Sequence, residues 1–253
     1  MIINDAHIHI GIFPSQTEQA YLDYSPEVIY SYISNIGIKK YIFSSAYTLD
    51  ANFNEEVEND LIRQMLYFGK GNAFAFYWVT QKKFLQDDKF SQIDKIDFKG
   101  LKLHSRECEW IKHPKKLERI MDIAKEREMA VILHCDDDYP PHIYEKYYQK
   151  YSEVKINIAH ARPLESAMKM LDRYDNVYTD ISFSPIENIK FLMSIPNISN
   201  RIMFGSDMPA PESFFNDNCC SYVQHRINQI SKELSQGLDK FFHLNMMSFL
   251  NTP

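Results

Sequence analysis

The chain begins with Ile2-Ile3-Asn4-Asp5-Ala6-His7-Ile8-His9-Ile10, a short run rich in β-branched residues. Seven more apolar runs follow it, and none shows the clean polar alternation of a half-exposed strand; they cover residues 38–44, 73–79, 98–104, 130–134, 155–160, 176–182 and 201–206. Runs of this kind are typical of strands that are buried on both faces of a parallel sheet. The sequence therefore predicts eight strands.

The segments between these runs have helical spacing. Leu117, Ile120, Met121 and Ala124 follow the i, i+3, i+4, i+7 pattern and form one apolar stripe, with Pro114 placed to start the helix. Strand and helix alternating eight times in 253 residues favours a closed α/β barrel, the (β/α)₈ or TIM barrel, over an open doubly wound sheet. We find no linker, so we expect a single barrel domain over residues 1–253, closed by two helices at residues 219–233 and 238–250.

The amino-acid composition, net charge and cysteine count argue against several classes of protein. Hydrophobic residues make up 45% and charged residues 25%, which is typical of a globular chain. The formal charge of −6 gives no general attraction to nucleic acid. Four cysteines show no disulfide framework, and neither a signal peptide nor an 18-residue apolar stretch is present. We expect a cytoplasmic protein that acts on a small molecule, without a nucleic-acid or membrane partner; a homo-oligomer stays open.

The most informative local feature is the pair His7 and His9 in the first run. Residues i and i+2 of a strand point to the same face, so both imidazoles can reach one ion. Lone histidines mostly fill cores and surfaces, and this pair alone does not separate metal binding from a structural role.

Four more residues with metal-binding side chains fall at strand ends. His104, His134, His160 and Asp207 lie at the C-terminal ends of the predicted fourth, fifth, sixth and eighth strands. Active sites of (β/α)₈ barrels lie at that end of the barrel, where side chains from several strands converge. The sequence therefore predicts one site built from distant parts of the chain.

In order and spacing these motifs resemble the successive signatures of the amidohydrolase superfamily, the metallo-dependent hydrolases. The resemblance is carried by residues 5–9 (DAHIH), 100–104 (GLKLH), 131–134 (VILH), 158–161 (IAHA), 178–182 (YTDIS) and 204–209 (FGSDMP). It is strongest to the amidohydrolase-2 branch, which contains aminocarboxymuconate-semialdehyde decarboxylase.

This resemblance implies a divalent metal site, usually zinc, with one or two ions. His7, His9 and Asp207 would be ligands, and His134 a further ligand. His160 would be a catalytic imidazole or a ligand to a second ion. In some superfamily members a lysine at the position of Lys102 is carboxylated and bridges two ions. In the favoured branch it more often binds substrate, and we assign Lys102 to the substrate.

Such a site activates water for attack on an amide, ester or lactone bond. We expect Asp207 to accept the proton of the attacking water and His160 to stabilise the oxyanion. Lys102 and His104 face inward together, Arg162 belongs at the barrel rim, and Trp78 ends the third strand. We predict that these four residues contact the substrate. If Lys102, Arg106 and Arg162 gather at the same rim, these cations favour an anionic substrate.

Three alternatives remain at this stage. A decarboxylase or hydratase acting on a carboxylated small molecule would use the same ligands. A TatD-like phosphoesterase also begins with a His-x-His strand, but the negative charge and the lack of a strand-end glutamate argue against it. A non-enzymatic barrel is the third, and the intact set of ligand residues argues against that.

Overall fold

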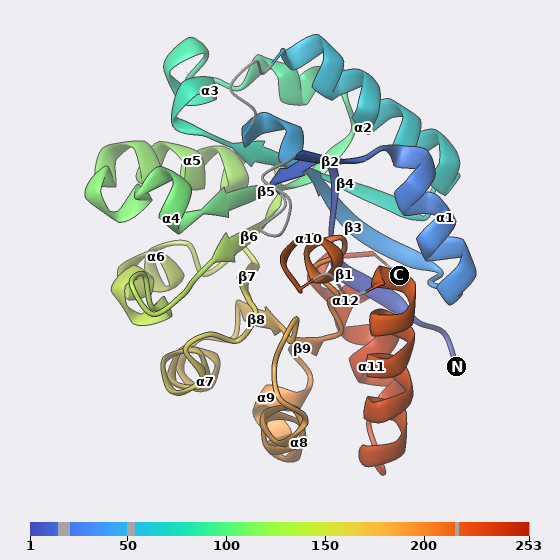
Figure 1. The fold of residues 1–253 in the computed structure, drawn as a ribbon. Helices are drawn as coiled ribbons and strands as arrows, with labels where there is room; N and C mark the ends of the chain where they lie inside the picture. The colour runs from blue at the N-terminus through green and yellow to red at the C-terminus, as the bar shows by residue number, and fades with distance from the viewer. Residues whose placement is uncertain (15–20, 50–53, 216–217, 253) are drawn as a thin grey trace.

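A computed structural model describes residues 1–14, 21–49, 54–215 and 218–252. Nine strands form one sheet in the order β2-β1-β3-β4-β5-β6-β7-β8-β9, and all neighbours are parallel except β1 and β2. The eight parallel strands confirm the predicted TIM barrel (Figure 1). The strands are β1 (Asn4–Pro14), β2 (Tyr21–Tyr24), β3 (Lys40–Ser45), β4 (Ala73–Val79), β5 (Phe98–His104), β6 (Ala130–His134), β7 (Ile156–Ala159), β8 (Val177–Asp180) and β9 (Ile202–Met203).

The barrel closes between β1 and the segment that follows β9. Ala6 N donates to Phe204 O at 2.9 Å, and His9 N donates to Met208 O at 2.7 Å. Between these two bonds, Asp207 N donates to His7 O at 2.8 Å. The first and last strands therefore meet at the histidine pair.

Helices alternate with the strands and surround the barrel (Figure 1). The α-helices are α1 (Pro26–Ile36), α2 (Glu55–Gly69), α3 (Gln81–Gln86), α4 (Ser105–Cys108), α5 (Pro114–Glu126), α6 (Glu145–Lys150), α7 (Leu164–Arg173), α8 (Ile186–Ser194), α9 (Pro196–Ser199), α10 (Ala210–Phe215), α11 (Cys219–Glu233) and α12 (Asn245–Phe249). Short 3₁₀ turns are η1 (Ala46–Leu49), η2 (Ser91–Lys95), η3 (Trp110–Lys112) and η4 (Pro141–Tyr144), and a π-helical turn, η5 (Lys240–Leu244), runs into α12.

Local sequence explains where these helices begin and end. In α1, Ser25 caps the N-terminus, Pro26 takes the first turn, and Gly37 ends the helix in the left-handed conformation. Asn54 caps α2 by accepting from the Glu56 and Val57 amides. The predicted apolar stripe of α5 is buried along its whole length, as an amphipathic helix packed on a barrel requires.

The inside of the barrel is filled by apolar side chains from alternate strand positions, closed at the N-terminal end by Met246, Met247 and Phe249 of α12. Gly100 is needed in this layer, because a Cβ there would lie 2.2 Å from Cε1 of Phe76. The predicted C-terminal helix at 219–233 coincides with α11, and the second one contains a π-helical turn before α12.

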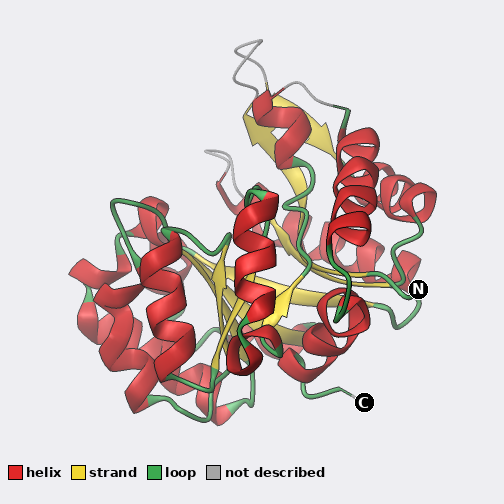
Figure 2. Cartoon of the chain, turned by 90° about the horizontal axis from the view of Figure 1, so that it is seen from below, coloured by secondary structure: helices red, strands yellow, loops and turns green. Residues whose placement is uncertain are grey.

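The sequence did not predict β2. The first strand continues past Ile10 to Pro14, and its end pairs antiparallel with β2 in the register Gly11 with Tyr24 to Pro14 with Tyr21. Figure 2 shows this two-stranded ribbon projecting beyond the barrel. No helix in the described part of the chain has the length and hydropathy needed to cross a membrane.

Candidate metal centre at the strand ends

The two histidines of β1 and the aspartate after β9 come together at the C-terminal end of the barrel. Nε2 of His7 lies 3.1 Å from Nε2 of His9, and Oδ1 of Asp207 lies 3.5 Å from the first and 3.1 Å from the second. Two of these distances join residues about 200 positions apart in sequence. The predicted juxtaposition of these three side chains is thus present in the structure.

A bulge in β1 helps to aim His7. Asp5 pairs with Tyr41 and Ile8 pairs with Phe43, so Ala6 and His7 together occupy the space opposite one residue of β3. Ala6 belongs to the apolar cluster inside the barrel, and His7 faces the polar cluster above it. Bulges often redirect side chains next to functional sites, and here the bulge lets two consecutive residues point inward.

Asp180, at the end of β8, is fully buried and contacts both His7 and the backbone of His160. Its Oδ2 lies 3.2 Å from Nδ1 of His7 and accepts from Nδ2 of Asn157 at 3.0 Å. Its Oδ1 accepts from the hydroxyl of Ser182 at 2.5 Å, and from the amides of Ser182 and His160 at 3.2 Å each. A carboxylate on Nδ1 leaves the lone pair of His7 on Nε2, the atom that faces the cluster.

His9 is oriented in a similar way. Its Nδ1 lies 2.9 Å from the hydroxyl of Ser44 at the end of β3. Nε2 of His9 is then the nitrogen that faces Asp207. Both imidazoles of β1 therefore present the same ring nitrogen to the same point.

His160 and His134 form the other side of the cluster. Among the described residues, His7, His160 and Asp207 each present a ligand atom within 4.8 Å of the other two. Nε2 of His160 also lies 3.2 Å from Nδ1 of His134. Nδ1 of His160 is buried without a hydrogen-bond partner among the described residues. The cluster thus offers two overlapping groups of possible ligands, one with His9 and one with His160, and His7 and Asp207 belong to both.

Lys102 lies inside this cluster. Its side chain is buried, and Nζ is 2.8 Å from Nε2 of His7. Burial lowers the pKa of Lys102 to about 8. A neutral or modified amine at this place would disturb a bound cation less than an ammonium would.

Three aromatic rings stack along one wall. The ring of His104 lies 3.9 Å from that of His134 at an interplanar angle of 12°, and 5.8 Å from that of Trp78 at 10°. Trp78 is also 5.2 Å from the ring of His9. Nδ1 of His104 accepts from the Glu107 amide at the start of α4. Trp78 and His104 thus line the cluster, and their contact with a substrate stays a prediction.

The electrostatics suit cation binding. Burial lowers the pKa of His9 to about 4 and also lowers the pKa of His134 and His160. Burial raises the pKa of Asp207, but the nearby imidazoles, His7 first among them, bring it well below its ordinary value. Neutral imidazoles next to an ionised carboxylate are the protonation states that metal ligands need.

The backbone is strained at the same place. His160, Ala161 and Asp207 have φ values of 68°, 49° and 56°, in the left-handed region that non-glycine residues seldom adopt. Such conformations are held by the surrounding structure and cluster at functional sites. Here they turn the chain sharply just after β7 and β9, where the ligand residues lie.

The predicted rim cations are arranged less simply. Arg106 pairs with Asp136 at 2.9 Å and with Asp138 at 3.1 Å instead of pointing at the cluster. Arg162 has an exposed side chain, and no hydrogen bond or ion pair joins it to the cluster among the residues described. Asp136 lies 3.7 Å from Nε2 of His134, so it borders the site from outside.

Sequence reasoning missed Asp5, Ser44 and Asn157. Asp5 is fully buried, and its Oδ1 accepts from the amides of His7 and Ser206 at 3.1 and 3.0 Å. Burial raises its pKa to about 7. Asp5 lies two positions before His7, and Asn157 lies three positions before His160. A polar residue shortly before a strand-end histidine was the available signal.

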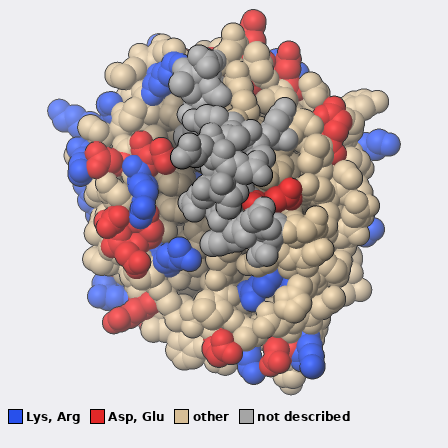
Figure 3. All heavy atoms as spheres, viewed as in Figure 1, with Lys and Arg blue, Asp and Glu red and all other residues tan. Residues whose placement is uncertain are grey.

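Acidic and basic side chains are intermixed around the face that carries the strand ends (Figure 3).

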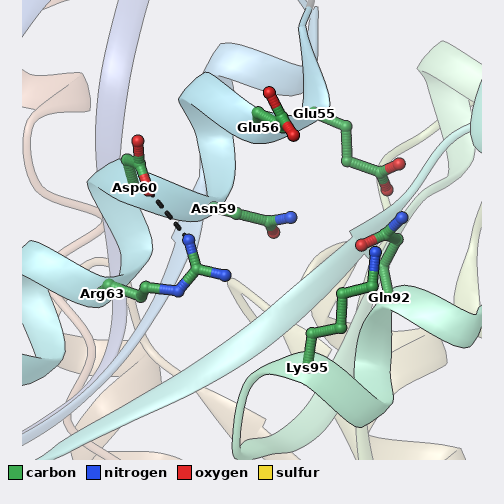
Figure 4. A pocket seen from close by; sticks show the side chains of 7 residues that line it. All are labelled: Glu55, Glu56, Asn59, Asp60, Arg63, Gln92 and Lys95. Carbon is green, nitrogen blue, oxygen red and sulfur yellow. Dashed lines mark hydrogen bonds and ion pairs between the residues drawn. The ribbon is translucent and has the colours of Figure 1, made fainter.

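A separate hollow of about 390 Å³ lies between α2 and η2 and is lined by Glu55, Glu56, Asn59, Asp60, Arg63, Gln92 and Lys95 (Figure 4). Its lining includes no residue of the strand-end cluster.

Histidines and an aspartate gathered at the C-terminal strand ends of a (β/α)₈ barrel lie where the active sites of enzymes with this fold are found. The sequence profile of the amidohydrolase family matches residues 87–245. The chain belongs to the amidohydrolase family, as its motifs suggested, and it is an enzyme.

Solved structures share this fold at low identity. An amidohydrolase 2 from Bifidobacterium longum subsp. infantis matches with a TM-score of 0.70 and 13% identity over 100% of both chains. A probable 2-pyrone-4,6-dicarboxylic acid hydrolase from Acinetobacter baumannii matches at 0.65 and 13%, covering 99% of this chain and 100% of the other. The dihydroorotase of Saccharomyces cerevisiae matches at 0.66 and 12%, covering 100% and 84%. No curated protein sequence matches the chain.

Proposed function

We propose that this enzyme is a metal-dependent hydrolase that acts on an amide, ester or lactone bond of a small, anionic metabolite. The observation that supports this most is the convergence of His7 Nε2, His9 Nε2 and Asp207 Oδ1 at 3.1–3.5 Å from one another. The neighbouring hydrolase folds agree with the reaction type, since they include a dihydroorotase and a probable pyrone dicarboxylate hydrolase.

The donor set fits a divalent ion such as Zn²⁺. Ligands held at about 2.0–2.1 Å in a tetrahedron lie roughly 3.3 Å apart, close to the separations of the three atoms above. The opposite ring nitrogens of His7 and His9 are occupied by Asp180 and Ser44, as metal-ligating imidazoles usually are. The carboxylate of Asp180 leaves a lone pair on Nε2 of His7, and Ser44 leaves one on Nε2 of His9 when its hydroxyl accepts from Nδ1, so both imidazoles can act as ligands through the nitrogen that faces inward.

We assign His7, His9 and Asp207 as ligands of the principal ion, with His134 as a further ligand. His160 approaches both the first group and His134, so one or two ions are consistent with the donors. The assigned residues span positions 7 to 207, and we therefore infer that residues 1–253 form one functional domain.

When bound, such an ion supplies Lewis-acid chemistry and lowers the pKa of water towards about 7. Asp207 can accept the proton of the attacking water at its carboxylate and return it to the leaving group. His160, whose Nδ1 has no hydrogen-bond partner among the described residues and lies 4.0 Å from Oδ1 of Asp180, can carry a proton to stabilise the developing oxyanion. The chain thus provides a base and an electrophilic partner within one buried cluster.

Lys102, His104 and Trp78 form the wall on which we place the substrate. The amine of Lys102 would attract a carboxylate, and the stacked rings of Trp78 and His104 would bind a flat or apolar portion. Arg162 follows His160 in the same turn and extends this anion preference to the rim.

Metal analysis of the purified protein, followed by hydrolysis assays on a panel of small lactones, amides and esters, tests the proposal. His7→Ala and Asp207→Asn should lose bound metal and activity together. His113→Ala, which changes an exposed histidine before α5, is the matched control. Retention of metal and activity by the two ligand variants would refute the assignment, and release of carbon dioxide from a carboxylated substrate would indicate a decarboxylase instead.

A further inference from the structure

A charged pair is buried on the outer side of the barrel, behind the substrate wall. Nζ of Lys83 in α3 lies 2.6 Å from Oε2 of Glu58 in α2, and both side chains are 1% exposed. Desolvation of two charges costs free energy that their attraction offsets only in part. Apolar side chains packed at these two positions would stabilise the fold as well as the ion pair does. We therefore look for a role of the pair other than stability.

Lys83 makes a second bond that connects the pair to the site. Its Nζ donates to the backbone carbonyl of Trp78 at 3.0 Å and lies 4.2 Å from the centre of the Tyr77 ring. These are consecutive residues near the C-terminal end of β4. The ion pair is therefore bonded to the backbone of a residue whose side chain faces His9 and His104.

No hydrogen bond from the indole N–H holds the side chain of Trp78 among the residues described. Its Nε1 is buried without a hydrogen-bond partner among the residues described. The ring is held by stacking, which allows sliding, and by its backbone. The bond from Lys83 to the Trp78 carbonyl is consequently a polar contact that, together with the pairing of β4 with β5 and the Lys102 amine 5.7 Å from the ring centre, can fix where the ring lies.

We propose that Lys83 and Glu58 are positioning residues that hold Trp78 against His9 and His104 and so set the shape of the substrate wall. Lys83 supplies the donor to the Trp78 carbonyl, and Glu58 orients the amine. The functional meaning of this inference rests on the proposed function, because it treats the surface next to His9 as the substrate site.

The test uses Trp78 as its own reporter. The chain has two tryptophans, so a Trp110→Phe background leaves Trp78 as the single indole fluorophore. In that background, Glu58→Leu with Lys83→Met removes both charges at once and leaves no lone buried ion. The matched control is Glu56→Gln with Lys95→Met, which removes one acid and one lysine from the exposed hollow of Figure 4.

We expect the Glu58→Leu/Lys83→Met variant to keep its far-ultraviolet circular dichroism while its Trp78 emission moves to longer wavelength. Its acrylamide quenching constant should rise by about twofold or more relative to the control, as local opening around the ring predicts. Emission and quenching equal to the control would overturn the proposal.

If the double variant does not fold, Lys83→Gln repeats the test, because the shorter amide cannot reach the Trp78 carbonyl while Glu58 is free to take up a proton. Lys83→Arg, which keeps a cationic donor, should preserve the parent emission, and a shift equal to that of Lys83→Gln would also contradict the proposal. All spectra are recorded without added metal. Failure to bind Zn²⁺ would therefore defeat the proposed function, whereas unchanged Trp78 emission would defeat this inference.

Discussion

Asp180→Asn is the perturbation that tests the architecture of the site most fully. The carboxylate of Asp180 accepts or shares five hydrogen bonds, with His7, Asn157, the amide of His160 and both the amide and the hydroxyl of Ser182. The substitution keeps the shape of the side chain but turns one oxygen into a donor. Because both groups near Oδ2 also present nitrogen, the new NH₂ meets His7 and Asn157 unfavourably.

The expected consequence is a weaker metal site in a folded protein. Loss of a carboxylate that orients a metal-bound histidine reduces metal affinity by about 10- to 100-fold. At about 1.4 kcal/mol for each factor of ten, this corresponds to roughly 1.4–2.8 kcal/mol. The loss arises because His7 is no longer fixed with its Nε2 lone pair facing Asp207.

Zn²⁺ affinity measured by competition with a chromogenic chelator gives this value directly. Asp122→Asn is the matched control, since Asp122 accepts a hydrogen bond from Tyr151 on the outer helix layer. Circular dichroism at increasing temperature shows whether the variant is folded. An affinity for Zn²⁺ within twofold of the parent, about 0.4 kcal/mol, in a folded Asp180→Asn protein would refute the reasoning.

Three further predictions follow from single contacts. Gly205→Ala should cost about 1–3 kcal/mol in the free energy of unfolding, since its Cβ would lie 2.9 Å from Cβ of Asp180; denaturation at an unchanged midpoint would contradict this. Lys102→Met should strengthen Zn²⁺ binding on the order of tenfold, because it removes a cation 2.8 Å from His7; collapse of the affinity, with a bicarbonate requirement in the parent, would make Lys102 a carboxylated ligand. Asp87 accepts from the amide and hydroxyl of Ser91 at 2.6 Å, and these bonds lower its pKa. Because the folded state lowers the pKa of Asp87, its ionised carboxylate stabilises the protein above about pH 4, and this stabilisation is lost on acidification. Asp87→Ala should therefore lower the free energy of unfolding by about 1 kcal/mol at pH 7, after screening, and by less at pH 3. An equal loss at both pH values would show that the ionised carboxylate is not its source.

The repeating architecture could be predicted because each strand is encoded locally. The runs at 73–79, 98–104 and 130–134 coincide with β4, β5 and β6, since strands buried on both faces are continuous apolar stretches. Pro114 begins α5 as expected. The short strand β2 was not predicted because its pairing depends on the extension of β1 beyond Ile10, which a local pattern does not specify.

Part of the site was equally accessible from sequence. His7, His9 and Asp207 were placed together by the rule that strand ends meet at one face of a barrel, and the structure brings them within 3.5 Å. That rule does not predict how deeply each side chain is buried or which neighbours it contacts. Lys102 was assigned to the substrate, yet its amine contacts His7, and Arg106 turns to Asp136. Such contacts depend on rotamers and on neighbours from other strands.

The groups behind the ligands were the least predictable. Ser44 and Asn157 lie outside the motifs, and Asp5 lies in one without an assigned role. Their roles arise only when the bulge at Ala6 and His7 and the closure of the barrel are known. Asp180 belongs to the motif at residues 178–182, but its contact with His7 joins residues 173 positions apart. Three-dimensional proximity, rather than residue type, makes these residues functional.

A crystal structure of the zinc-loaded protein, with anomalous data collected on both sides of the zinc edge, tests the central claim most directly. The account predicts an anomalous peak about 2.0–2.2 Å from Nε2 of His7, Nε2 of His9 and a carboxylate oxygen of Asp207. A peak bound elsewhere, or none at this cluster in crystals grown with saturating zinc, would contradict it.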